Sequence, residues 1–256
     1  MKSISVVLLS LFFLLLVACE HRRLINEGQN HVNYNIEEKN AELHEVNVEM
    51  AAGELNIMSG EEGLFNGNFN YPLESWKPEF DYEKNGGVIT TSITQKMKWN
   101  MEDVDGNNEW DLLFDSKVPL ILKLNIGAGE CDVDLAGTNI KSFEINTGAG
   151  ESSIDLSNTN VSEVNLKAGV GEVRLDLSGN WSNDNRTVVN GGIGQLTVYV
   201  PENIGVRARV SGLLGEVNHN LRKDGSYYVN ELYGSSDYTM ELIISAGIGE
   251  VSIREK

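Results

Sequence analysis

The chain has 256 residues, a formal net charge of −18 at pH 7 and two cysteines, Cys19 and Cys131. A chain this acidic is repelled by phosphate backbones, so nucleic acid is excluded as a partner. Its length suffices to bury a core that is stable without disulfides.

The first residues, 1–18, are predicted to be a secretion signal. Their apolar run from Ile4 to Val17 is too short and wrongly flanked for a membrane-spanning helix. The segment from Leu16 to Cys19 resembles the bacterial lipobox, in which the cysteine becomes the acylated first residue of the mature chain. This resemblance implies lipidation at Cys19 and an extracytoplasmic location on a membrane of the cell envelope, because two or more acyl chains anchor a protein stably.

Three segments follow before the main body of the chain. Residues 19–42 are polar, rich in Asn and Glu and without apolar periodicity, which predicts a flexible tether. Residues 43–97 contain alternating stretches such as FNGNFNY from Phe65 and predict a small N-terminal β-subdomain. Residues 98–109 are acidic, carry a turn signal at Asp105-Gly106 and predict a connector.

One motif recurs along the rest of the chain: alternating apolar residues, a glycine-rich corner that ends in Glu, and a second alternating stretch. Its seven copies are VNVEMAAGELNI from Val46, LKLNIGAGECDVDL from Leu122, FEINTGAGESSIDL from Phe143, VNLKAGVGEVRLDL from Val164, TVVNGGIGQLTVYV from Thr187, ARVSGLLGEVNHNL from Ala208 and LIISAGIGEVSI from Leu242. Alternation with a period of two on both arms predicts two strands per copy, each with one buried face.

The spacing of the copies predicts a solenoid. The first corner glycine recurs at Gly127, Gly148, Gly169 and Gly192, a period of about 21 residues. Two strands and two corners of this length return the chain to its start, about 4.8 Å further along, so that inward Val, Ile and Leu stack. The predicted fold class is all-β: a parallel β-solenoid over residues 110–256, with two strands per coil stacked in chain order, plus the small N-terminal β-subdomain.

The interval between the last two copies leaves two alternatives open. Residues 222–240 are rich in Tyr and too long for a bare corner. They form either an extra coil with a degenerate corner or a cap over the open end of the core.

A resemblance to the toast-rack family spans about 43–256. It is carried by the GAGE-type corners, Trp76-Lys77-Pro78, Val118-Pro119-Leu120, the segment from Gly225 to Tyr228 with Tyr233, and Gly247-Ile248-Gly249. The same solenoid forms the C-terminal domain of LiaF-type regulators of envelope stress, and surface adhesins have similar GxG solenoids. The resemblance implies an envelope-facing β-solenoid and supplies no catalytic residues. LiaF-type proteins carry membrane-spanning helices where this chain has a lipid anchor.

Stacking of the coils would align Glu130, Glu151 and Glu172 as a ladder. Like charges about 4.8 Å apart repel by roughly 0.9 kcal/mol in water, so something must offset the repulsion. Either each carboxylate accepts hydrogen bonds from backbone N–H groups at the glycine corner, or the ladder binds a cation such as Ca²⁺. Because no Asp-rich calcium loop is present, the structural interpretation is favoured, and neither a metal nor a cofactor is predicted.

Two further features are candidate partner contacts. Asp134, Asp155 and Asp176 form a second outward column, which is either a solvated face or, as in polysaccharide lyases built on β-helices, a glycan site. Trp181 lies in a lengthened polar corner and either contacts a glycan or protein or folds back over the solenoid edge. Cys131 takes an inward position and is predicted to be a buried, inert thiol.

The sequence contains no Ser/His/Asp arrangement, phosphate loop or metal-ligand spacing, so the chain is predicted not to be an enzyme. These features predict a lipid-anchored cell-envelope protein whose solenoid recognises an envelope protein or a glycan, in envelope-stress sensing or response. The alternatives are a surface adhesin and a glycan-binding or glycan-active protein.

Overall fold

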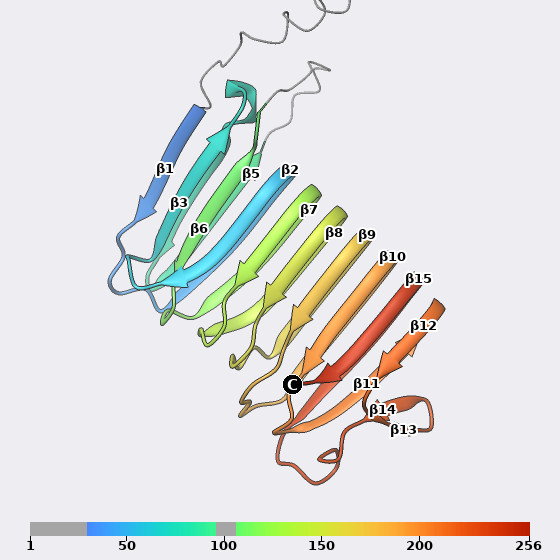
Figure 1. The fold of residues 1–256 in the computed structure, drawn as a ribbon. Helices are drawn as coiled ribbons and strands as arrows, with labels where there is room; N and C mark the ends of the chain where they lie inside the picture. Colours follow the sequence, from blue (N-terminus) through green and yellow to red (C-terminus); the bar gives the residue numbers. More distant parts are fainter. Residues whose placement is uncertain (1–29, 96–105) are drawn as a thin grey trace, which may run out of the picture.

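The computed structural model describes residues 30–95 and 106–256. They form one 15-stranded sheet that is bent into a stack of coils, with a single short 3-10 helix, η2 (Glu74–Trp76), as their only helical element (Figure 1). The predictions for residues 1–29, including Cys19, and for residues 98–105 lie outside the described part of the chain.

Each full coil is one long strand that bends at its glycine corner. The coils are β2 (Leu43–Gly60), β7 (Leu120–Asp134), β8 (Ile140–Asp155), β9 (Glu163–Asp176), β10 (Asn185–Val200) and β15 (Thr239–Glu255). Adjacent coils pair in parallel and stay in register through the corner. The predicted parallel solenoid is confirmed, and its two strands per copy are the two arms of one continuous strand.

The core lies between the two arms of each coil. Equivalent inward residues form columns, of which one consists of Val48, Leu124, Ile145, Leu166, Val189 and Ile244, all buried. Cys131 lies in a neighbouring column, and burial raises the pKa of its thiol to about 12. Cys131 is therefore buried, as predicted, and a thiol with this pKa stays protonated at neutral pH.

The last coils do not stack in chain order, contrary to the prediction. β15 inserts between β10 and the coil formed by β11 (Gly205–Ser211) and β12 (Leu214–His219), although it follows both in sequence (Figure 1). The insertion places Glu241 between Arg186 and Arg207, and its carboxylate forms an ion pair with each guanidinium group.

Stacking in chain order would instead set these two arginines against each other, because both are aligned with Glu241. Like charges directly opposite each other destabilise a strand pair. The insertion also pairs Val188 with Ile243, two apolar residues at positions that are otherwise polar. Charge and hydrophobic contact therefore both favour the observed order.

The N-terminal segment is not a separate subdomain, because it continues the same solenoid. β5 (Val88–Gln95) pairs in parallel with the first arm of β2, and β6 (Glu109–Asp115) pairs in parallel with its second arm. β5 and β6 thus lie beneath the two arms of β2, and the described residues between them, 106–108, form no glycine corner like those of the other coils.

Two side chains complete the corner of β2 where this neighbouring glycine corner is missing. The Gln95 Oε1 atom accepts a hydrogen bond of 2.9 Å from the backbone N–H of Ala51, and the Asn108 side chain donates one of 2.6 Å to the carbonyl oxygen of Ala52. The carbonyl oxygen of Asn108 accepts a third, from the Glu54 N–H. The corner backbone of β2 is thus satisfied although no glycine corner lies beneath it.

The tether prediction is wrong for residues 30–36. They form β1 (Asn30–Ile36), which pairs with β3 (Phe65–Tyr71), and β3 pairs antiparallel with β6. Apolar side chains at alternate positions of β1, Tyr34 and Ile36 among them, pack against the core. The remaining strand of this end, β4 (Pro78–Asn85), forms an antiparallel hairpin with β5.

The interval 222–240 covers part of the other end and is not an extra coil. β13 (Arg222–Asp224) and β14 (Tyr227–Val229) form a small hairpin, and β14 pairs antiparallel with the outer edge of β11. Of the two alternatives, the cap is therefore the one observed.

The corner glycines are required for two different reasons. The second glycine of each corner has a positive φ, for example +135° at Gly150, and a Cβ there would lie 1.8 Å from the carbonyl oxygen of Gly129. The first glycine has no such φ, but a Cβ at Gly148 would lie 2.2 Å from the carbonyl oxygen of Gly127. Any side chain at these positions would push adjacent coils apart.

We expect Gly150→Ala to destabilise the protein by about 3 kcal/mol or more, because the backbone strain and the clash add. Gly137 is the matched control, since its φ is +69° and a Cβ there would meet nothing within 4 Å. Gly137→Ala should cost about 1 kcal/mol, from the conformation alone. Urea denaturation of both variants measures the difference, and equal losses would contradict the proposed role of the corner.

Candidate functional site

The outer side of the second arms carries the most distinctive surface chemistry. The structure places Glu130, Glu151 and Glu172 in register on adjacent coils. The carboxylate ladder, as we call the full row, runs in the spatial order Glu109, Glu54, Glu130, Glu151, Glu172, Gln195, Glu250 and Glu216. Only Gln195 interrupts its charge.

The central carboxylates are exposed and uncompensated. Glu54, Glu130, Glu151 and Glu172 make no ion pair and accept no hydrogen bond within the described residues, whereas Glu250 accepts one from Asn218 (2.8 Å). The backbone hydrogen bonds expected at the glycine corner are therefore not what holds these side chains. Nor does any group of three or more Asp, Glu, His or Cys side chains in the described ranges have an arrangement that could hold a metal ion.

The ladder borders a shallow open groove of about 310 Å³. Besides the buried Cys131 and Ser152, its lining consists of outward residues that we name the acidic face: Glu54, Asn56, Glu130, Asp132, Glu151, Ser153, Glu172 and Arg174. Arg174 is its one cation, and its guanidinium group stacks over the ring of Tyr199 at 4.6 Å. A groove this open, lined by carboxylates, suits an extended basic ligand better than an enclosed metabolite.

The outer side of the first arms differs in character. Lys123 pairs with Glu144 at 3.6 Å, and the side-chain amide of Asn146 donates a hydrogen bond of 2.9 Å to Asn125. Opposite charges and paired amides leave this side nearly balanced. The excess negative charge of the coils thus concentrates on the acidic face.

The second predicted column is in register, but its residues have a local structural role. Asp134, Asp155 and Asp176 each accept a hydrogen bond from the backbone N–H two residues later, at 3.3, 2.8 and 2.9 Å. These bonds fix the turns that follow the second arms. Asp176 is buried, which by itself would raise its pKa, but hydrogen bonds from Lys256 and Ser178 hold the pKa below its usual value.

Trp181 lies inside the fold and not on its surface. Its side chain is only 3% exposed, and its indole N–H donates a hydrogen bond of 2.8 Å to the carbonyl oxygen of Leu177. The ring therefore covers the edge of the core, which was the alternative to partner contact. Its polar sequence neighbours gave the wrong signal, because they stay at the surface while the indole turns inward.

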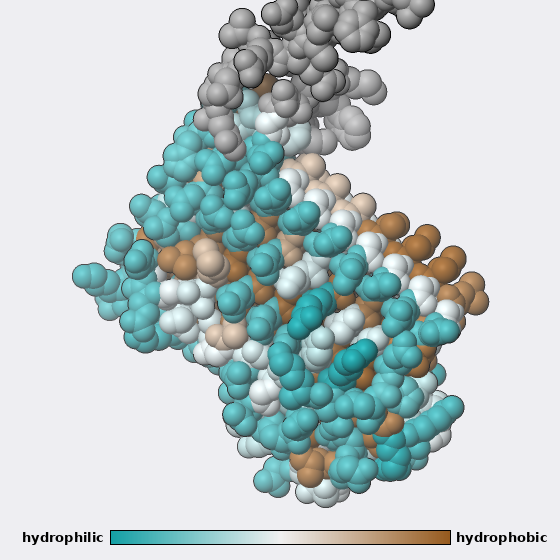
Figure 2. Space-filling model, in the orientation of Figure 1, coloured by the Kyte–Doolittle hydropathy of each residue, from teal (hydrophilic) through white to brown (hydrophobic). Residues whose placement is uncertain are grey.

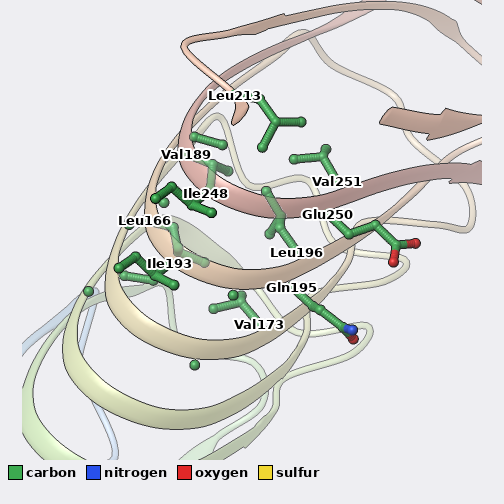
Figure 3. A pocket seen from close by; sticks show the side chains of 17 residues that line it. Leu166, Val173, Val189, Ile193, Gln195, Leu196, Leu213, Ile248, Glu250 and Val251 are labelled. Carbon is green, nitrogen blue, oxygen red and sulfur yellow. The ribbon is translucent and has the colours of Figure 1, made fainter. Parts of the chain in front are cut away.

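A small cavity lies just inside the glycine corners of β9, β10 and β15 (Figure 3). It is lined by inward side chains such as Leu166, Val189 and Leu196 and also by the half-exposed Ile193 and Ile248 of the corners, and it has a volume of about 30 Å³. That volume holds a water molecule or two and no metabolite. The cavity is a packing gap at the bend, so the acidic face remains the candidate site.

The ladder is expected to cost stability. Replacing Glu151 by Gln should stabilise the protein by up to about 2 kcal/mol at low salt, because it removes repulsion from both neighbours. Gln195→Glu should destabilise it by a similar amount, since it would join Glu172 to Glu250. Both effects should nearly vanish at about 1 M salt. Denaturation at two salt concentrations measures them, and a salt-independent loss in Glu151→Gln would mean that the carboxylate is structural.

No helix within residues 30–95 and 106–256 is long and apolar enough to cross a membrane. Among curated proteins, none matches the chain. A solved structure of a "putative cell adhesion protein" from Clostridium sporogenes is 32% identical to it with a TM-score of 0.68, covering 90% of this chain and 100% of that one. A "putative adhesin" from Bacteroides fragilis covers 89% and 98% at 9% identity, with a TM-score of 0.33 that is too low to support an inference.

The family match agrees with the coil architecture. Residues 25–160 and 142–199 match the family described as the N-terminal domain of toast_rack, DUF2154. Two overlapping matches are what a repeated coil produces, because one copy can be aligned with another. Together these matches span more than half of the sequence, and the chain therefore belongs to the toast-rack family.

Proposed function

We propose that this protein is a lipid-anchored protein of the cell envelope that recognises a basic segment of another envelope protein through its acidic face. It would act by binding, without catalysis. The observation that carries the proposal is the exposed, in-register and uncompensated row of carboxylates from Glu54 to Glu172.

The fold alone does not account for this row. Gln195 occupies the same position in β10, in register with Glu172 and Glu250, so a neutral side chain fits the corner equally well. Stacked like charges repel and lower stability. Residues that lower stability and have no structural role are typical of functional sites, because such sites retain side chains needed for activity even when these destabilise the fold.

The shape of the acidic face suits an extended partner. Adjacent coils repeat the same outward positions about every 4.8 Å, so the carboxylates form a straight row on a rigid support. An extended basic peptide laid across the coils would meet a new carboxylate at each step. Rigidity of the support lowers the entropy lost on binding.

A second candidate function is adhesion at the cell surface. Its support is the 32% identity to the "putative cell adhesion protein" over 90% of this chain. Adhesion and recognition within the envelope would use the same face and differ in where the partner lies. Envelope-stress sensing, the third possibility, has the toast-rack resemblance to LiaF-type regulators as its support.

Neutralising the acidic face should weaken binding of a basic probe. We expect Glu130→Gln/Glu151→Gln/Glu172→Gln to lower the affinity for an octalysine peptide at least about tenfold at low salt, because three charge contacts are lost. The matched control is Glu45→Gln/Glu49→Gln/Glu163→Gln, which removes the same charge from the first-arm side and should change affinity less than about threefold. Calorimetric titration measures both.

Equal losses in the two triple variants would show that net charge, not the acidic face, attracts the probe. Attachment of cells that carry either variant separates adhesion from recognition within the envelope. A selective loss of attachment in the Glu130, Glu151 and Glu172 variant would favour adhesion.

The anchor is tested separately at Cys19. We expect Cys19→Ser to move the protein from the membrane fraction to the soluble fraction, because the expected acylation site is lost. Immunoblotting of fractionated cells and mass measurement of the mature chain check this. Retention of Cys19→Ser in the membrane fraction would contradict lipid anchoring.

A further inference from the structure

The edge of the solenoid where the strands bend carries an exposed hydrophobic row. In the seven described corners, the residue before the second corner glycine points away from the core. In spatial order these residues are Ala52, Ala128, Ala149, Val170, Ile193, Ile248 and Leu214. Their side chains grow from methyl groups at the N-terminal coils to branched aliphatic groups at the C-terminal coils.

The four large members form a continuous patch, which we name the corner ridge. Val170, Ile193 and Ile248 are 54%, 53% and 53% exposed, and Leu214 is 71% exposed. Figure 2 shows hydrophobic side chains gathered along this edge, and Figure 3 shows Ile193 and Ile248 one above the other where the ribbon bends. With coils about 4.8 Å apart, the corner ridge is about 14 Å long.

Folding does not require these side chains. The equivalent positions of β2, β7 and β8 hold alanine in the same backbone geometry. Aligned, exposed aliphatic groups favour aggregation and mark a contact surface when they persist. The corner ridge thus requires an apolar partner, which the acidic face next to it does not supply.

The geometry of the ridge fits a soft apolar phase better than a second protein. It is convex and one residue wide, and it exposes too little area for a stable dimer. Two copies would also bring Glu172, Glu250 and Glu216 close to their counterparts. In β9, β10 and β15 the ridge residue and the glycine that follows it pair with both neighbouring coils, so few backbone polar groups of these corners would be left unpaired at a lipid interface.

The described chain also begins at this edge. Asn30, the first residue of β1, pairs with Tyr71; the adjacent Asn70 pairs with Glu109, and Glu109 pairs with Glu54 beside the corner glycine Gly53. Asn30 therefore lies at the row of corners. Ten residues, 20–29, lie between Cys19 and Asn30 along the chain, so the eleven residue-to-residue steps from Cys19 to Asn30 span at most about 40 Å.

The maximum length of this tether is similar to the distance along the corner edge from β1 to the corner ridge. Six strand spacings, about 29 Å, separate β1 from β9, where the corner ridge begins. We propose that the corner ridge docks on the lipid bilayer that holds the anchor, so that the corner edge lies along the membrane and the side chains of Val170, Ile193, Ile248 and Leu214 enter the headgroup–acyl boundary. This inference rests on the lipid anchor of the proposed function.

Docking would orient the acidic face. In each coil the ladder residue follows the ridge residue by two positions and lies on the second arm. The carboxylate ladder would therefore stand beside the membrane and point parallel to its surface. A partner attached to the same membrane would then meet it without having to pass over the solenoid. The anchor supplies proximity, and the ridge fixes the orientation.

Depth-dependent quenching tests the docking on the full, acylated chain. Ile193→Cys labelled with bimane is placed in phosphatidylcholine vesicles with brominated acyl chains. Acylation blocks Cys19, and burial with a pKa of about 12 protects Cys131 from labelling. Ser153→Cys on the acidic face is the matched control site. We expect at least about threefold stronger quenching at position 193 than at position 153.

A second variant keeps the fold and removes the ridge. Val170→Ala/Ile193→Ala/Ile248→Ala reproduces the residues of the N-terminal coils, so it should keep the fold and lower the melting temperature by a few degrees at most, since these side chains are only half-buried. With a bimane label at Leu214→Cys, quenching should fall about threefold or more relative to the same label on the intact ridge.

Three outcomes would overturn the docking. The first is equal quenching at positions 193 and 153, and the second is unchanged quenching in the alanine variant. The third is the formation, in the absence of vesicles, of a dimer that shields the label at position 193. Flotation of the vesicles distinguishes failure of the docking from failure of the lipid anchor. Protein that floats with the vesicles while its position 193 stays in water disproves the docking and leaves the anchor intact, whereas protein that does not float disproves the anchor.

Discussion

The whole structure depends on how closely adjacent coils approach at the glycine corners. A Cβ at the second glycine would lie 1.7–1.8 Å from the carbonyl oxygen of the neighbouring coil in β7, β8, β9, β10, β15 and β12 alike. This contact keeps the strands in register while the chain turns from one arm to the other. The inward columns, the carboxylate ladder and the corner ridge all follow from that register, because each consists of equivalent positions brought into line.

The regular part of this fold could be predicted from the sequence, because its signal is repeated. Alternating apolar residues on both sides of each corner predict the two arms, and a constant period predicts their parallel stacking. The ends of the sheet depend on contacts that occur once. Pairing of β1 with β3 and replacement of a glycine corner by Gln95 and Asn108 leave no periodic trace. The same holds for Trp181, whose burial depends on a single turn.

The order of the last coils was predictable in part from departures within the pattern. Val188 and Ile243 break the polar alternation at equivalent positions, and the structure pairs them with each other. Arg186 and Arg207 occupy the same position in their coils as Glu241 does in β15, and Glu241 forms an ion pair with each of them. These signals were present in the sequence, but they gain meaning only when the assumption of stacking in chain order is dropped. Of the two surfaces, the carboxylate ladder was predicted from the sequence and the corner ridge was not. The ridge residues lie within the glycine-rich motif, which was interpreted only as a turn of the backbone.

One short motif generates both surfaces and also separates them. Within each corner the residue before the second glycine points outward at the bend, and the next outward residue, usually Glu, begins the second arm. Stacking converts these two positions into two parallel rows, one apolar and one acidic. The acidic row is continuous from Glu54 to Glu172, and the apolar row becomes bulky only from Val170 onward. Gln195 removes one charge beside Ile193, whereas Glu172, Glu250 and Glu216 follow Val170, Ile248 and Leu214. The two rows therefore overlap at the C-terminal coils, where the aliphatic groups lie at the bend and the carboxylates lie on the second arms. Because the bend separates the two directions, one row can contact lipid while the other remains in water to bind a partner.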